Sequence, residues 1–188
     1  MPIRKSIRSS IAVILTVCMF FISYAGITTS AKTSFKSYKA VIKYYQENRG
    51  ADSASCKYIK LKSGKGTAKF MAVTELNGAY MTNTKLYAPA DGKIKLVNSF
   101  PGYITHIAKD KKSFMTYGYS GSGMGGYRFF KYNAKKNKFE QKCAVAYDTE
   151  AYLYPERETN AKKKMLKKCK VKMSSYKAIT TVTTKIYG

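Results

Sequence analysis

Short hydrophobic runs separated by turn signals fill most of the chain from Cys56 onward. Apolar and polar residues alternate in these runs, and Asn-Gly, Asp-Gly and other glycine-rich turns separate them. We predict strands over residues 57–61, 68–75, 79–87, 93–99, 103–108, 113–119, 127–132 and 138–147. Strands of this length joined by such turns favour an antiparallel meander. A parallel α/β sheet is excluded, because no long helical pattern lies between the runs.

A helical pattern precedes the strands, over residues 32–50. Apolar residues recur there at three- and four-residue spacing, at Phe35, Tyr38, Ile42 and Tyr45, and lysines occupy the opposite face. Ser34 or Ser37 is suited to cap the start of this helix. The fold class that follows is α+β: one N-terminal amphipathic helix packed on an antiparallel β-meander of about seven strands, in a single domain over residues 32–188. The tail adds a helix-like, lysine-rich stretch at 159–172 and a last strand within 180–187.

The first 31 residues have the organisation of a signal peptide. Arg4, Lys5 and Arg8 form a basic start, residues 11–27 are an apolar run of seventeen, and small residues suit cleavage after Ala25 or Ala31. The competing interpretation is an uncleaved membrane anchor, because about 17 apolar residues lie at the lower end of what spans a bilayer. Either interpretation places the protein outside the cell or at the cell envelope.

The mature chain is strongly basic. Removing residues 1–31 takes away three of the 35 basic residues and none of the ten acids, which leaves a net charge of +22. Such a charge attracts polyanions, whether wall polymers, lipid headgroups, nucleic acid or acidic polysaccharide. Because nearly all the bases are lysines, which suit bidentate phosphate recognition poorly, we do not expect specific nucleic-acid recognition.

Three cysteines remain in the mature chain, enough for one disulfide and one free thiol in an oxidising compartment. We predict a disulfide between Cys143 and Cys169, which leaves Cys56 free. Because the chain has one histidine and no C-x-x-C, we expect no zinc site and no metal or other cofactor.

Two groups of residues are candidates for catalysis. His106 is the only histidine and could serve a nucleophile as a base, although no acidic partner lies near it in the sequence. Four of the ten acids fall within eleven residues and are interleaved with tyrosines: Asp148, Glu150, Glu156 and Glu158. Paired carboxylates of a glycosidase must converge from opposite sides of a bond, so the favoured interpretation is internal neutralisation of lysines.

Two further motifs have simpler structural explanations. Residues 121–126 match G-x-G-x-x-G by letter, but they join two aromatic runs instead of a strand and a helix, so we interpret them as a hairpin tip. Basic and aromatic residues interleave over 127–139, as in some single-strand nucleic-acid sites. Alternation on a half-buried strand produces the same pattern, and we favour core packing.

The order of these parts resembles a loose group of uncharacterised secreted proteins and lipoproteins of Gram-positive bacteria. The likeness covers most of residues 35–147 and rests on the tyrosine-rich helix, the stretch Leu-Tyr-Ala-Pro-Ala-Asp-Gly-Lys-Ile-Lys-Leu at 86–96 and the glycine-rich hairpin at 119–127. It implies an α+β domain without a known activity. Members of that group typically carry a calcium-type loop, D-x-D-G-D-G-x-x-E-L, after the first helix.

That loop is degenerate here. Gly64 and Gly66 match its two glycines and Phe70 its closing leucine. Its acidic positions are occupied by Leu61, Ser63, Lys65 and Lys69. Calcium requires oxygen ligands with negative charge, so the stretch predicts a site for an anion, with Lys62, Lys65 and Lys69 as its cations.

The function that follows is that of an exported, strongly basic, non-enzymatic protein. We expect it to associate with an anionic cell-wall polymer or a lipid surface through its charge. The alternative is a secreted hydrolase that uses the Asp148–Glu158 cluster or His106. The sequence leaves the oligomeric state open.

Overall fold

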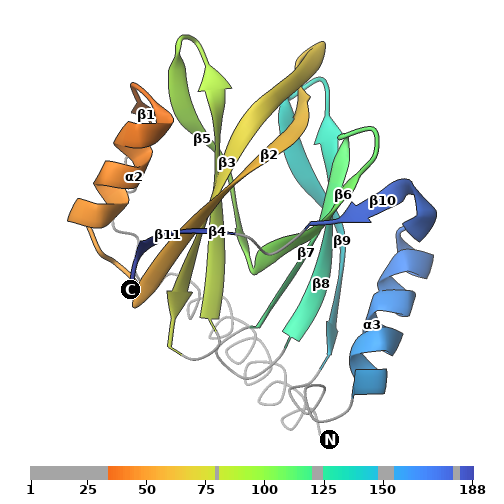
Figure 1. The fold of residues 1–188 in the computed structure, drawn as a ribbon. Helices are drawn as coiled ribbons and strands as arrows, with labels where there is room; N and C mark the ends of the chain where they lie inside the picture. The colour runs from red at the N-terminus through yellow and green to blue at the C-terminus, as the bar shows by residue number, and fades with distance from the viewer. Residues whose placement is uncertain (1–33, 79–80, 120–124, 148–154, 180–182) are drawn as a thin grey trace, which may run out of the picture. The chain divides into compact units, whose positions relative to one another are not determined.

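A computed structural model describes residues 34–78, 81–119, 125–147, 155–179 and 183–188 (Figure 1). All of them belong to one compact unit. The predicted signal peptide lies outside the described residues. Within the described ranges, no helix has the length and apolar character needed to span a membrane.

The described elements are predominantly strands. In chain order they are β1 (Ser34–Phe35), α2 (Tyr38–Glu47), β2 (Ser53–Ser63), β3 (Gly66–Asn77), β4 (Met81–Ala90), β5 (Lys93–Pro101), β6 (Tyr103–Ala108), β7 (Ser113–Tyr119), β8 (Gly125–Asn133), β9 (Lys138–Tyr147), α3 (Pro155–Lys168), the 3₁₀ turn η2 (Met173–Ser175), β10 (Tyr176–Ala178) and β11 (Thr184–Tyr187).

The strands form two antiparallel sheets. One has the order β11-β2-β3-β4-β5-β1 and the other β10-β6-β7-β8-β9. Among the described residues, one parallel pair joins them, Met81 of β4 with Tyr119 of β7. The result is a β-sandwich or half-barrel.

The expected α+β class, a meander of about seven strands with an N-terminal helix packed on it, is therefore wrong. The structure is 61% strand and 18% helix, with two short helices among the described elements. The physical reason is visible in β3, where Phe70, Met71, Ala72 and Val73 are all buried. Four consecutive buried residues mean that both faces of a strand are covered. A one-sided meander under a helix would bury only every second residue.

The main core lies between the two sheets. Ile59, Leu61, Phe70 and Leu86 come from the first sheet, and they share one cluster with aromatic side chains of the second: Phe114, Phe130 and Phe139. The rings of Phe114 and Phe130 stack with centroids 5.0 Å apart. Between the sheets, the ring centroid of Phe100 in β5 lies 5.3 Å from that of Phe114 in β7. Each buried side chain of this size stabilises the fold by about 1.5–3 kcal/mol, so contacts of this kind hold the sheets together.

The helix α2 contributes to a second, smaller cluster on the first sheet. Ser37 caps its start by accepting a hydrogen bond from Ala40 N at 3.2 Å. Val41 and Tyr45 are its buried residues, and Tyr45 Oη lies 2.9 Å from Tyr87 Oη of β4. Burial raises the pKa of Tyr45 and raises that of Tyr87 to about 12, so both hydroxyls stay protonated.

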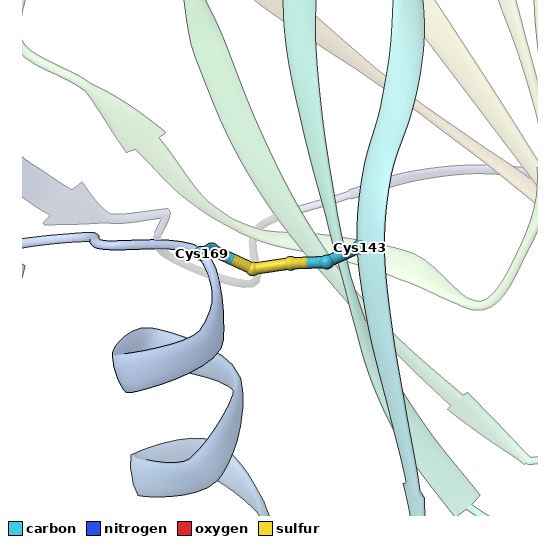
Figure 2. Close-up of a disulfide and its surroundings, with 2 residues drawn as sticks. All are labelled: Cys143 and Cys169. Carbon is cyan, nitrogen blue, oxygen red and sulfur yellow. A yellow bond between two sulfur atoms is a disulfide. The ribbon is translucent and has the colours of Figure 1, made fainter.

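The helix α3 belongs to a third cluster, on the second sheet. Its Ala161 and Met165 are buried, and Met165 shares a cluster with β7 and β8 side chains. A disulfide joins Cys143 of β9 to Cys169, directly after the helix (Figure 2). It is the pair expected from the sequence. Cys56 is a buried free thiol, and burial raises its pKa.

Candidate functional site

Three hairpin turns meet at one end of the two sheets. The first connection ties the β2–β3 turn to the β8–β9 turn. Gly64 N donates a hydrogen bond to Tyr132 Oη at 2.7 Å and to Asn137 Oδ1 at 3.0 Å, and the Tyr132 hydroxyl donates to Asn137 Oδ1. Gly64 has a positive φ of 55°, which glycine adopts without strain. These bonds join Gly64 to residues that lie 68 and 73 positions away in the sequence.

The β6–β7 turn joins the same group through backbone bonds. Lys62 N donates to Lys111 O at 2.9 Å, and Tyr132 N donates to Lys112 O at 2.7 Å. Lys111 N closes its own turn on Ala108 O at 2.9 Å. Because each turn is bonded to another, the three are ordered as a unit and not as separate loop tips.

Lysines dominate this unit, which we call the basic end: residues 62–66, 109–112 and 134–137. It carries seven lysines and one carboxylate, Asp110. The lysines are Lys62, Lys65, Lys109, Lys111, Lys112, Lys135 and Lys136, of which Lys62 and Lys111 are half-buried and the others exposed. Asp110 Oδ1 accepts a hydrogen bond from Lys112 N at 2.9 Å, which stabilises the turn.

Few carboxylates neutralise these lysines. Among the ion pairs of the described residues, those of the basic end involve only Lys136, whose Nζ lies 3.0 Å from Glu140 Oε1. Glu140 also pairs with Lys142 at 2.9 Å. Hydrogen bonds from Asn133, Lys142 and Lys136 lower the pKa of Glu140 to about 2. Adjacent positive charges with so little compensation create a positive potential that attracts anions.

The three lysines expected to form an anion site are only partly brought together. Lys62 and Lys65 belong to the basic end, and Lys62 Nζ donates to Lys65 O at 2.8 Å. Lys69 lies further along the β2–β3 hairpin, directly opposite Lys60. Its Nζ is 3.9 Å from the ring centroid of Tyr58, a cation–π contact, so it is not at the turn.

The other cations of the basic end lie in turns and were not predicted as part of an anion site. Lys109, Lys111 and Lys112 occupy one turn and Lys135 and Lys136 another. The available signal was that lysine pairs occur at two alternate turns of one meander, between β6 and β7 and between β8 and β9. Alternate turns of a meander lie at the same edge of a sheet, which brings such pairs close together.

The structure gives no support to the catalytic candidates. Asp148 and Glu150 lie outside the described residues, and the backbone places Glu156 and Glu158 in the first turn of α3. His106 pairs with Met115 and Ala178 in its sheet, and burial together with the Lys162 charge lowers its pKa. A base needs a reacting group within hydrogen-bond reach, and among the described residues the buried Nδ1 of His106 has no hydrogen-bond partner.

The structure tests one of the two motifs that had a simpler structural explanation. Phe129, Phe130 and Phe139 of the basic–aromatic stretch are buried, so these rings pack in the core and cannot stack on bases. The glycine-rich stretch 121–126 lies mostly outside the described residues. Across the described ranges, no group of three or more His, Cys, Asp or Glu side chains could hold a metal ion.

Comparison with known proteins identifies no relative of this chain. No protein-family model, no curated protein and no solved structure matches the chain. The resemblance to exported proteins of Gram-positive bacteria stays a prediction.

Proposed function

We propose that this protein binds an anionic polymer of the cell envelope through the basic end and does not act as an enzyme. One observation carries the proposal: three turns from different hairpins are hydrogen-bonded together and carry seven lysines with one carboxylate. Lysines that only keep a protein soluble need not be gathered or ordered. The signal peptide predicted from the sequence accounts for how the chain would meet such a polymer.

The chemistry of the turns favours a polymer over a lipid surface. A protein that lies on a bilayer combines basic side chains with apolar ones that enter the headgroup region. Within residues 62–66, 109–112 and 134–137 the only apolar side chain is that of Ala134. A flexible chain of phosphate or carboxylate groups can instead satisfy several lysines without any insertion.

The proposal is tested by measuring binding of long-chain polyphosphate to the purified full chain as a function of salt. We expect the logarithm of the affinity to fall linearly with the logarithm of salt concentration, because bound lysines release counterions. The variant Lys112→Gln/Lys135→Gln should bind about 25-fold more weakly, at about fivefold for each lysine. The matched control Lys43→Gln/Lys185→Gln removes the same charge elsewhere and should bind nearly as the unaltered chain does. Equal weakening in both variants would show that only net charge matters, and the proposal would then fail.

A further inference from the structure

A second group of lysines lies on α3 and on the segment that follows it. Residues 159–172 contain seven lysines and no acid. The helix buries Ala161 and Met165. Its exposed lysines, together with those after it, are Lys163, Lys164, Lys167, Lys168, Lys170 and Lys172. Lys163 with Lys167, and Lys164 with Lys168, are like charges four residues apart, a spacing that destabilises a helix.

The chain beyond α3 carries further exposed lysines, which together with those of the helix we call the α3 row. Lys168, Lys170 and Lys172 are exposed, while Cys169 and Val171 between them pack into the cluster under the helix. The disulfide at Cys169 anchors this segment to β9 (Figure 2). The lysines are therefore carried by an ordered backbone that faces solvent at every second residue.

The helix ends in a Schellman motif that has a lysine at its key position. Val171 N donates to Leu166 O at 2.9 Å and Lys170 N to Lys167 O at 3.2 Å. Lys170 has a φ of 54°, the left-handed conformation that usually calls for glycine. Lys111, in the basic end, has a φ of 62° and shares this property. Both positions hold a positive charge where backbone conformation favours glycine.

This row of lysines leads to the basic end. Lys109 N donates a hydrogen bond to Ser175 O at 2.9 Å, and β10 pairs with β6 immediately beyond. Residues 172–175 thus bring the row to the β6–β7 turn (Figure 1). From Lys163 to Lys168 the helix extends about 7.5 Å, counting about 1.5 Å per residue, and the Schellman turn then leads the chain to Lys172.

We infer that the α3 row and the basic end form one continuous track that binds a linear polyanion along its length. This rests on the proposed function and specifies its ligand, a chain of repeating phosphate or similar anionic groups longer than the basic end alone. A short oligoanion occupies the basic end only, whereas a long chain also contacts the α3 row. Affinity should therefore rise with chain length.

The test compares tripolyphosphate with long-chain polyphosphate on the purified full chain. The variant Lys163→Gln/Lys167→Gln keeps good helix formers and removes two like charges four residues apart, so it should fold. We expect about 25-fold weaker binding of the long chain and unchanged binding of tripolyphosphate. Lys170→Gly places glycine in a left-handed backbone conformation that favours it, so this variant should also fold. It should weaken binding of the long chain only, by about fivefold. The matched control is Lys36→Gln/Lys39→Gln, which removes one lysine just before α2 and one within it.

The outcomes separate the two proposals. If the α3 variants bind the long chain as tightly as the unaltered protein, while Lys112→Gln/Lys135→Gln weakens both ligands, the track is wrong and the basic end stands. If no variant changes binding of either ligand, both proposals are wrong. Binding to anionic vesicles without binding to polyphosphate of either length also overturns both.

Discussion

Replacing Lys111 by glycine should change folding stability and ligand affinity in opposite directions. Lys111 has a φ of 62°, which costs an ordinary residue about 1–2 kcal/mol. Glycine removes that cost but gains about 0.5–1 kcal/mol of backbone freedom in the unfolded chain. The bonds that Lys111 makes to Lys62 N and Ala108 O use its backbone and remain in the variant. The net gain should be about 0.5–1 kcal/mol in the free energy of unfolding.

Affinity for polyphosphate should fall in the same variant. One lysine near an anionic ligand contributes about 1 kcal/mol, or about fivefold in affinity. Removing it should also reduce the slope of log affinity against log salt by about 1. Lys111→Arg is the control, because it keeps the charge and the left-handed backbone and should match the unaltered chain.

Thermal unfolding and a salt titration of polyphosphate binding measure both effects on the same samples. We expect the midpoint of Lys111→Gly to rise by about 2 °C while its affinity falls about fivefold. A variant that is more stable and binds with full affinity would refute the place of Lys111 in the binding surface. A variant that is less stable would refute the turn geometry.

Three further predictions concern other parts of the structure. Replacing both Cys143 and Cys169 by serine opens a loop with a sequence separation of 26, and should lower the free energy of unfolding by about 3.5 kcal/mol. Urea unfolding measures this loss, and a loss below about 1 kcal/mol would contradict the disulfide. The pKa of Tyr87 is raised from 10.0 in the unfolded chain to about 12, so its contribution to stability is complete below pH 10 and is lost as the pH rises to about 12. Urea unfolding across that pH range should show the free energy of unfolding declining, and the decline should be smaller in Tyr87→Phe. An equal decline in that variant would contradict the assignment of the pH dependence to Tyr87. Glu140→Gln frees Lys136 and Lys142 from their shared partner and should raise polyphosphate affinity about fivefold, and weaker binding by this variant would contradict the electrostatic account.

The strands follow from local sequence, whereas their assembly does not. Asn-Gly, Asp-Gly and glycine-rich turns position the hairpins because they permit backbone conformations that few other residues adopt. The closure into two facing sheets depends on contacts such as Phe70 with Phe139, whose ring centroids are 6.2 Å apart and which lie far apart in the sequence. The buried run from Phe70 to Val73 carried the signal that both faces are covered.

The candidate site was predictable only where it is local. Lys62 and Lys65 flank one glycine turn, and their proximity follows from the hairpin itself. Lys111, Lys112 and Lys135 join them only because Gly64 and Tyr132 hold separate hairpins together. No spacing in the sequence specifies those bonds, since they depend on how the two sheets close.

Lysine footprinting with and without long-chain polyphosphate tests the central claim most directly. The reaction of an amine reagent with each lysine, followed by mass spectrometry, reports which side chains the polyanion covers. We expect strong protection of Lys65, Lys112 and Lys135 and full reactivity of the exposed Lys43 and Lys185. Protection spread evenly over all exposed lysines, or absent from the three turns, would contradict a localised binding surface.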